Sequence, residues 1–203
     1  MGTNYKWRQI DDLSRPYFLN EDDICIYARE HTNGGYEASE SNQMLFNYKK
    51  PLDGKDKPGW YYKKHSVALF AAELSELNFP AGSVLVPAPT SNPRSSGNFD
   101  SRIEDTIIEL IKYQQNLLFQ PVLDLKQAIP SAHAGGGSRN PFEIKKNLMV
   151  SPFTIEPVPK RIFLIDDMIT TGGHFRAFKD KLLEKYPSLQ VIGIFWAKHV
   201  FSD

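Results

Sequence analysis

The chain has 203 residues, which is enough for one domain with a substantial hydrophobic core. Its 24 lysines and arginines balance its 24 aspartates and glutamates, so no overall charge attracts nucleic acid or an anionic membrane. One cysteine, Cys25, excludes an internal disulfide and a cysteine-based zinc finger, and no apolar run approaches the roughly 20 residues of a membrane-spanning helix. We therefore expect a cytoplasmic, single-domain protein over residues 1–203.

The N-terminal part of the sequence predicts a β-hairpin. Apolar side chains alternate along Asp22–Glu30 and again along Gln43–Lys49, and alternation is the period of a strand. A turn signal (Asn-Gly-Gly, residues 33–35) lies between the two segments. We expect a hood and hairpin over residues 1–60 and a core over residues 61–203.

Further along the chain, segments with the helical period alternate with short apolar segments. Helices are expected at Trp60–Leu77, Ile103–Leu118 and Gly173–Glu184, and strands at Val84–Val86, Phe119–Leu123, Arg161–Ile165 and Val191–Ala197. This alternation predicts an α/β fold with a parallel sheet flanked by helices. Lys126–Lys160 is rich in glycine, serine, proline and asparagine, and we expect a long loop there that could act as a lid.

The most informative segment follows the predicted strand at Arg161–Ile165. Two carboxylates, Asp166 and Asp167, come first, and a Thr-Thr-Gly-Gly run at residues 170–173 then opens the next helix. Ligands of open α/β sheets bind at the carboxyl ends of strands, and glycines at a helix N-terminus let backbone N–H groups surround a phosphate. Adjacent carboxylates suit ribose hydroxyls or a hydrated Mg²⁺ ion. A purely structural alternative is that the acids cap the helix and the glycines form a turn.

This segment resembles the phosphoribosyl pyrophosphate (PRPP) signature of the type I phosphoribosyltransferases. The resemblance implies the fold of that family, contacts from Asp166 and Asp167 to the ribose hydroxyls, and a loop that holds the 5-phosphate. The implied 5-phosphate loop comprises Met168, Ile169, Thr170, Thr171, Gly172, Gly173 and His174. His174 departs from the family, which usually has a small residue there, and its imidazole could either donate to the phosphate or partly fill the site.

A less specific resemblance links the strand at Val84–Val86 and the residues after it to the ComF-like (competence protein F-like) branch of the family. The loop after this strand binds pyrophosphate in the family. The implied pyrophosphate ligands are Thr90, Ser91, Asn92 and Arg94. We expect Arg94 to be the main one, because a guanidinium can bridge phosphate oxygens, and an incidental surface arginine is the alternative.

The resemblance also implies a flexible loop that closes over PRPP and shields the reacting carbon from water. Residues 131–139 fit that part, and His133 and Arg139 could reach the pyrophosphate from there. The implied reaction transfers a 5-phosphoribosyl group with release of pyrophosphate, with Asp166, Asp167 and Arg94 as catalytic residues. The Mg²⁺ ion would arrive with PRPP and would have no direct protein ligand.

The acceptor stays unassigned at this stage. In the family a variable hood binds it, and the hood aromatics that could stack a base are Tyr5, Trp7, Tyr17 and Phe18, although they could equally be packing. A different class of function is a non-catalytic sensor of PRPP or a nucleotide, because the same fold also serves in regulators. Dimers are common in the family, so a homodimer is one alternative, but the sequence does not fix the oligomeric state.

A third class of function is a nucleic-acid-linked accessory protein that acts in DNA uptake or defence beside a partner protein. A cluster of cations surrounds three aromatic residues, and such a cluster could stack the bases of a single strand. The cluster consists of Lys49, Lys50, Lys55, Lys57, Lys63 and Lys64 around Trp60, Tyr61 and Tyr62. Asp53 and Asp56 dilute its charge, so a solvated loop is the alternative.

Overall fold

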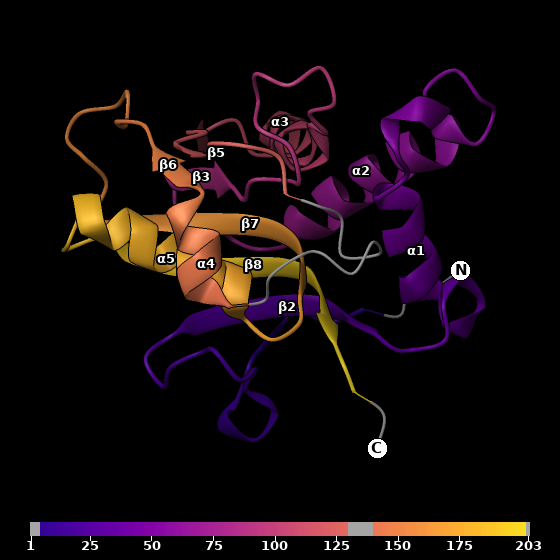
Figure 1. The fold of residues 1–203 in the computed structure, drawn as a ribbon, viewed down its shortest axis with the longest axis horizontal. Helices are drawn as coiled ribbons and strands as arrows, with labels where there is room; N and C mark the ends of the chain where they lie inside the picture. The colour runs from indigo at the N-terminus through magenta and orange to yellow at the C-terminus, as the bar shows by residue number, and fades with distance from the viewer. Residues whose placement is uncertain (1–4, 130–139, 202–203) are drawn as a thin grey trace.

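The centre of the fold is a six-stranded sheet (Figure 1). We analysed a computed structural model that describes residues 5–129 and 140–201. The strands follow the order β1 (Arg8–Gln9), β2 (Ile24–His31), β8 (Gln190–His199), β7 (Arg161–Ile169), β3 (Val84–Pro87) and β4 (Leu118–Phe119). Only the β1–β2 pair of this sheet is antiparallel. The carboxyl ends of β2, β8, β7 and β3 therefore meet at one edge of the sheet.

The strands separate two hydrophobic cores because successive side chains point to opposite faces. Along β7, Ile162 and Leu164 belong to one core and Ile165 to the other. Along β8, Phe195 and Trp196 divide in the same way. Strands that are buried on both faces need apolar residues at nearly every position, which explains the continuous apolar runs in the sequence.

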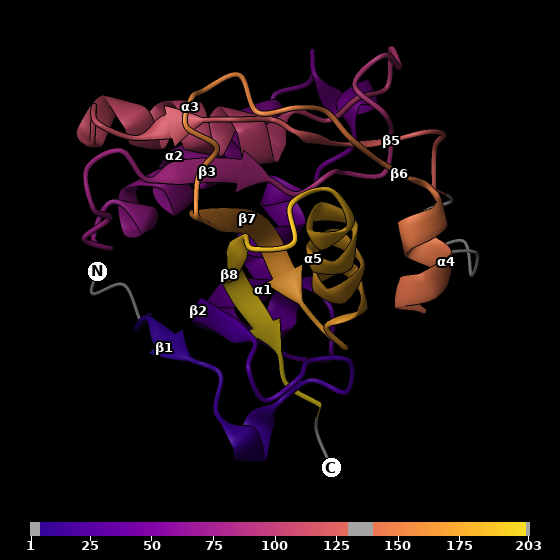
Figure 2. The ribbon, with the colours of Figure 1, turned by 90° about the vertical axis from the view of Figure 1, so that its left-hand side faces the viewer.

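Helices cover both faces of the sheet (Figures 1 and 2). One core contains α5 (Gly173–Lys185), α4 (Pro141–Lys146) and the small antiparallel pair β5 (Leu123–Leu125) and β6 (Leu148–Val150). The other contains α1 (Glu40–Tyr48), α2 (Trp60–Leu74) and α3 (Arg102–Tyr113). Short 3-10 turns lie at Asp12–Ser14, Tyr36–Ala38 and Leu52–Gly54. The expected α/β fold with a mostly parallel sheet flanked by helices is confirmed.

The expected N-terminal hairpin is wrong. Its second strand is the helix α1, which begins where the Ser39 hydroxyl accepts a hydrogen bond from the N–H of Asn42 at 3.0 Å. Leu45 and Tyr48 are buried three residues apart, which is the helical period. Its first strand is β2, but β2 pairs in parallel with β8 inside the main sheet.

The expected long loop at Lys126–Lys160 is also wrong in part, because it contains α4 and β6. The side chain of Asn140 caps the N–H of Phe142 at 2.9 Å, and Pro141 occupies the first turn of α4. The Asn140-Pro141 pair, which is a helix-start signal, is present in the sequence. β7 runs four residues past the expected end of its strand, so both acids of the motif lie within it.

A buried ion pair attaches α2 to the sheet. The guanidinium of Arg29 on β2 pairs with the carboxylate of Glu73 on α2, and the indole N–H of Trp196 on β8 donates to the same carboxylate at 2.8 Å. Burial raises the pKa of Glu73, and the neighbouring Arg29 opposes that shift. Cys25 is also buried, and burial raises the pKa of its thiol, as expected for a core residue. No helix among the described residues is long and apolar enough to cross a bilayer.

Candidate phosphate-binding site

The candidate site is the turn that joins β7 to α5 at the carboxyl edge of the sheet (Figure 2). Thr170 and Thr171 leave the strand, and Gly172 forms the helix N-cap with a φ of +80°. Only glycine adopts this left-handed conformation without a steric penalty. Gly173 is the first residue of α5. The two glycines therefore turn the chain sharply and leave the backbone open to a ligand.

The backbone N–H groups of this turn are available. Among the described residues, no atom accepts a hydrogen bond from the N–H of Thr170, Thr171 or Gly172. The first N–H groups of α5 have no acceptor within the helix, as at every helix N-terminus, and they lie at the positive end of its dipole. Unpaired N–H groups that converge at a helix N-terminus form a site for an anion such as phosphate.

The N-terminal segment braces the outside of the turn. The N–H of Phe18 donates to the carbonyl of Thr171 at 2.9 Å, and the side chains of Pro16 and Leu19 face Gly172. A Cβ at Gly172 would lie 2.9 Å from a methyl group of Leu19. The space left beside Asp166 and the turn is about 10 Å³, close to the volume that one water molecule needs.

The two acids of the motif have different surroundings. Asp167 is 5% exposed, and its two oxygens accept from Lys49 and Arg102, each at 2.8 Å. Burial alone would raise the pKa of Asp167, but these two cations lower it below its ordinary value. Asp166 has no ion pair among the described residues, and burial together with the charge of Asp167 raises its pKa. Asp166 is therefore the acid that is available to a ligand.

Asp167 belongs to a chain of charges that reaches α2. Arg102 also pairs with Asp100 at 2.7 Å, and Asp100 accepts from the buried Lys63 at 2.8 Å. The sequence-based interpretation missed Lys49 and Arg102 as neighbours of the acid pair. Their signal was weak, because Lys49 ends α1 and Arg102 begins α3, both distant in sequence from β7.

The structure places the expected pyrophosphate residues after β3, at the same edge of the sheet. Thr90 is buried and donates to the carbonyl of Asp100 at 3.1 Å, while Ser91 accepts from the N–H of Ile129 at 2.8 Å. Arg94 is turned away from the acid pair: its guanidinium donates to Glu104 and to the carbonyl of Leu123, each at 2.5 Å. Asn92 is half-buried in this loop.

The remaining expected ligands fall into three groups. Ile169 is 2% exposed and packs in the core, whereas Met168 is half-buried and lines the small space beside Asp166. The side chain of His174 is exposed at the first turn of α5. His133 and Arg139 lie outside the described residues.

Two of the four aromatic residues expected in the hood lie away from the turn. Trp7 donates from its indole to the carbonyl of Glu73 at 3.0 Å, and the hydroxyl of Tyr5 donates to Glu76, so both pack on the α2 side. Tyr17 and Phe18 form an edge-to-face pair with ring centroids 4.8 Å apart, and Phe18 bonds to the turn itself.

Two histidines that the sequence did not single out lie at the same edge of the sheet. His31 ends β2 and His199 ends β8, and their Nδ1 atoms are 2.9 Å apart. Burial lowers the pKa of His31, and the nearby His199 and Lys49 lower it further. Lys49, which pairs with Asp167, therefore lies near this imidazole pair as well.

The residues around the turn offer few direct ligands to a magnesium ion. Among the described residues, no group of three or more acidic, histidine or cysteine side chains is arranged to hold a metal. One carboxylate, Asp166, has no cationic partner and faces the space beside the turn. This arrangement fits an ion that brings most of its oxygen ligands with a diphosphate and water, as Mg²⁺ does.

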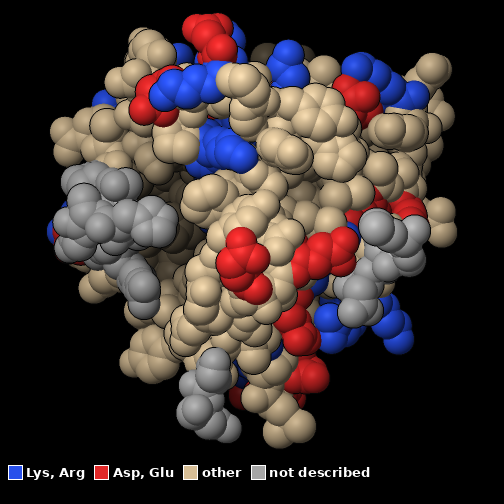
Figure 3. All heavy atoms as spheres, turned by 90° about the vertical axis from the view of Figure 1, so that its right-hand side faces the viewer, with Lys and Arg blue, Asp and Glu red and all other residues tan. Residues whose placement is uncertain are grey.

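The expected basic and aromatic cluster near α2 does not form one continuous surface. Lys63 is buried in its ion pair with Asp100, whereas Tyr61 and Tyr62 are exposed. On the face of the molecule shown in Figure 3, basic and acidic side chains are interspersed, and no unbroken basic stripe crosses it. A single strand of nucleic acid would need such a stripe along its backbone.

Solved structures that are similar to this chain include two phosphoribosyltransferases. A hypoxanthine phosphoribosyltransferase from Staphylococcus aureus is 10% identical, and the match covers 68% of this chain and 74% of that chain with a TM-score of 0.38. A Helicobacter pylori xanthine-guanine-hypoxanthine phosphoribosyltransferase is 12% identical, and the match covers 70% and 86% with a TM-score of 0.36. No protein-family description matches the sequence, and no curated protein is significantly similar to it. The ComF-like branch is not confirmed, and the function has to be argued from the site itself.

Proposed function

We propose that the chain binds PRPP at the turn between β7 and α5 and transfers its 5-phosphoribosyl group to an acceptor. The observation that supports this most strongly is the set of N–H groups at Thr170, Thr171 and Gly172, which have no acceptor among the described residues and lie just past a pair of carboxylates on β7. The turn would hold the 5-phosphate, and Asp166 would accept hydrogen bonds from the ribose hydroxyls.

In the proposed reaction, the bond between the anomeric carbon and the pyrophosphate oxygen breaks, and the acceptor nucleophile forms a new bond to that carbon and loses a proton. A magnesium ion bound to the pyrophosphate would neutralise charge on the leaving group. Positive charge develops on the ribose ring, and the carboxylate of Asp166 would stabilise it electrostatically. Arg102 and Lys49, which lie within 2.8 Å of Asp167, are better placed than Arg94 to face a diphosphate.

A second function, binding of PRPP without transfer, is favoured by one specific observation. The cations near the site already have partners: Arg94 is held by Glu104 and a carbonyl, and Arg102 is shared between two aspartates. A sensor would need no free cation for a leaving group, whereas transfer requires at least one of these pairs to open.

The test is a calorimetric titration with PRPP and Mg²⁺, together with an assay of pyrophosphate release in the presence of candidate bases. We expect wild-type binding, and we expect Asp166→Asn to weaken it at least about tenfold through the lost ribose contacts. The matched control is Asp56→Asn, in an exposed loop. Release of pyrophosphate would support transfer, binding without release would support the sensor, and no binding by the folded wild type would contradict both.

A further inference from the structure

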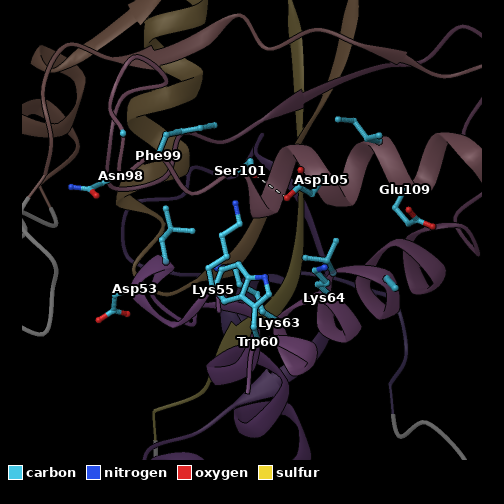
Figure 4. A pocket seen from close by; sticks show the side chains of 15 residues that line it. Asp53, Lys55, Trp60, Lys63, Lys64, Asn98, Phe99, Ser101, Asp105 and Glu109 are labelled. Atoms are coloured by element: carbon cyan, nitrogen blue, oxygen red, sulfur yellow. Dashed lines mark hydrogen bonds between the residues drawn. The ribbon is translucent and has the colours of Figure 1, made fainter. Parts of the chain in front are cut away.

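A hollow lies away from the turn between β7 and α5, between the start of α2 and the start of α3 (Figure 4). Its volume is about 860 Å³, which is within the range of roughly 300–1,000 Å³ that small-molecule sites occupy. Its lining shares no residue with the space beside Asp166. The proposed function makes no use of it.

One wall of the hollow is aromatic and basic. The indole of Trp60 is half-buried, and in Figure 4 it stands beside Lys55 and points toward α3. Lys55 and Lys64 line the wall, and neither has an ion pair among the described residues. The deeper Lys63 is 5% exposed and stays neutralised by Asp100. Two exposed lysines thus share a wall with the indole, and the ammonium of the deeper Lys63 lies 5.4 Å from the centroid of the same ring.

The opposite wall is acidic and polar. Asp105 and Glu109 are one turn apart on α3 and line the same hollow. Ser101 donates to Asp105 at 2.8 Å and fixes the direction of its carboxylate, and Asn98 and Phe99 close the end of the wall (Figure 4). Carboxylates accept hydrogen bonds only, so this wall suits a ligand edge that carries donors.

We propose that this hollow binds a nucleoside monophosphate whose base carries amino or imino donors. The base would stack on the indole of Trp60, its donor edge would face Asp105 and Glu109, and its phosphate would lie between Lys55 and Lys64. The aromatic and basic wall thus matches the base face and the phosphate of such a ligand, and the acidic wall matches its donor edge. The inference is independent of the proposed function, because it rests on other residues.

A strand of nucleic acid fits this hollow less well than a mononucleotide. The carboxylates of Asp53, Asp105 and Glu109 would repel a continuous phosphate backbone. The exposed rings of Tyr61 and Tyr62, which could extend a stacking surface, do not line the hollow. The side chains of the hollow can therefore contact one base and one phosphate, as in a mononucleotide.

The experiment follows tryptophan fluorescence while guanosine 5′-monophosphate is added. We expect a saturable change that disappears in Trp60→Phe, which leaves Trp7 and Trp196 as silent references. We expect the change to persist in excess ribose 5-phosphate, which would occupy the turn after β7 but offers no base. Persistence in that competition separates this site from the proposed function.

Variants that remove charged side chains test where the phosphate and the base of the ligand bind in the hollow. The double variant Lys55→Ala/Lys64→Ala is expected to lower the affinity for guanosine monophosphate at least about tenfold. The affinity for guanosine, which has no phosphate, should not change. The double variant Asp105→Asn/Glu109→Gln is expected to lower the affinity for both ligands. The control is Lys181→Ala on α5, and circular dichroism checks that each variant is folded.

Two results would overturn the inference. One is the lack of any Trp60-dependent change in the folded wild type at millimolar guanosine monophosphate. The other is an oligodeoxynucleotide that binds more tightly than the mononucleotide and competes with it, because this would assign the surface to a strand instead.

Discussion

Asp166 and Asp167 are neighbours in sequence, but among the described residues only Asp167 of the two forms ion pairs. Side chains of adjacent strand residues point to opposite faces, so the two carboxylates meet different environments. Asp167 meets Lys49 and Arg102, whereas Asp166 meets the turn of Thr170–Gly173 and Phe195. The first acid is suited to a ligand and the second to holding α1 and α3 against β7.

This difference predicts opposite effects on stability. Asp167→Asn leaves the largely buried Arg102 without half of its charge compensation, and we expect it to lower the free energy of unfolding by about 3 kcal/mol. Asp166→Asn removes a carboxylate without an ion pair and should leave stability unchanged or slightly higher. Urea unfolding of both variants measures this. Equal losses in the two variants would contradict the assignment.

The pKa shifts predict how stability depends on pH. Because the pKa of Asp166 is raised in the folded chain, its protonated form stabilises the fold below the ordinary carboxyl pKa of about 3.9, and this contribution is lost as pH rises through the folded value. The pH dependence that Asp167 contributes has the opposite sign. Its contribution to stability is present above about pH 3.9 and is lost as the pH falls toward its lowered pKa.

Asp166→Asn should therefore gain stability relative to wild type as pH rises above about 4, and the gain should level off above the folded pKa of Asp166. Urea unfolding at a series of pH values gives the difference directly. A difference that stays constant across this range would show that Asp166 is not shifted.

At the scale of elements, the turn between β7 and α5 depends on one backbone conformation. Gly172→Ala should cost about 1–2 kcal/mol, because alanine resists a φ of +80° and its Cβ would approach Leu19. The substitution should also weaken the binding of PRPP, because it would tilt the backbone N–H groups of the turn. Gly54→Ala, where an added Cβ meets nothing within 4 Å, is the control for both measurements. Equal behaviour of the two variants would remove the special role of the turn.

The attachment of α2 to the sheet depends on Glu73. Glu73→Gln leaves the buried guanidinium of Arg29 with only Glu40, 3.9 Å away, and we expect a loss of about 3–5 kcal/mol in the free energy of unfolding. Glu76→Gln, at an exposed position just after α2, should cost less than about 1 kcal/mol. Thermal and urea unfolding compare the two variants.

Among the strands, the ones that the sequence predicted well are buried on both sides. β3, β7 and β8 have continuous apolar runs, and such runs specify a central strand independently of their partners. α1 was mistaken for a strand because three apolar residues happen to alternate along it. The helical period of Asn42, Leu45 and Tyr48 decides the structure, since these are the residues that are buried. Local alternation cannot show which residues the rest of the chain will cover.

The same limit applies to the candidate site. The turn and its glycines could be predicted because they are contiguous in sequence and their chemistry is local. The partners of Asp167 could not, because Lys49 and Arg102 reach it only once α1 and α3 have packed on the sheet. Arg94 was preferred for its position after β3, and the sequence could not show that its guanidinium donates to Glu104 and to the carbonyl of Leu123.

At the scale of the whole molecule, the N-terminal region is part of the central sheet. β2 contributes a strand next to β8, and the Pro16–Leu19 segment braces the phosphate turn. We therefore expect one cooperative unfolding transition, with equal calorimetric and van't Hoff enthalpies. A shortened chain that starts at residue 61 should not fold, because β8 would lose β2, one of its two partner strands. Two separate transitions, or a folded shortened chain, would contradict this.

The central claim is that backbone N–H groups of the turn after β7 bind a phosphate, and the amide resonances of Gly172 and Gly173 test it most directly. In a chain labelled with ¹⁵N-glycine, addition of ribose 5-phosphate should shift these two resonances strongly and leave Gly34 and Gly82, which have positive φ values in other turns, unchanged. Shifts confined to other glycines, or no shift at saturating ligand, would contradict the account.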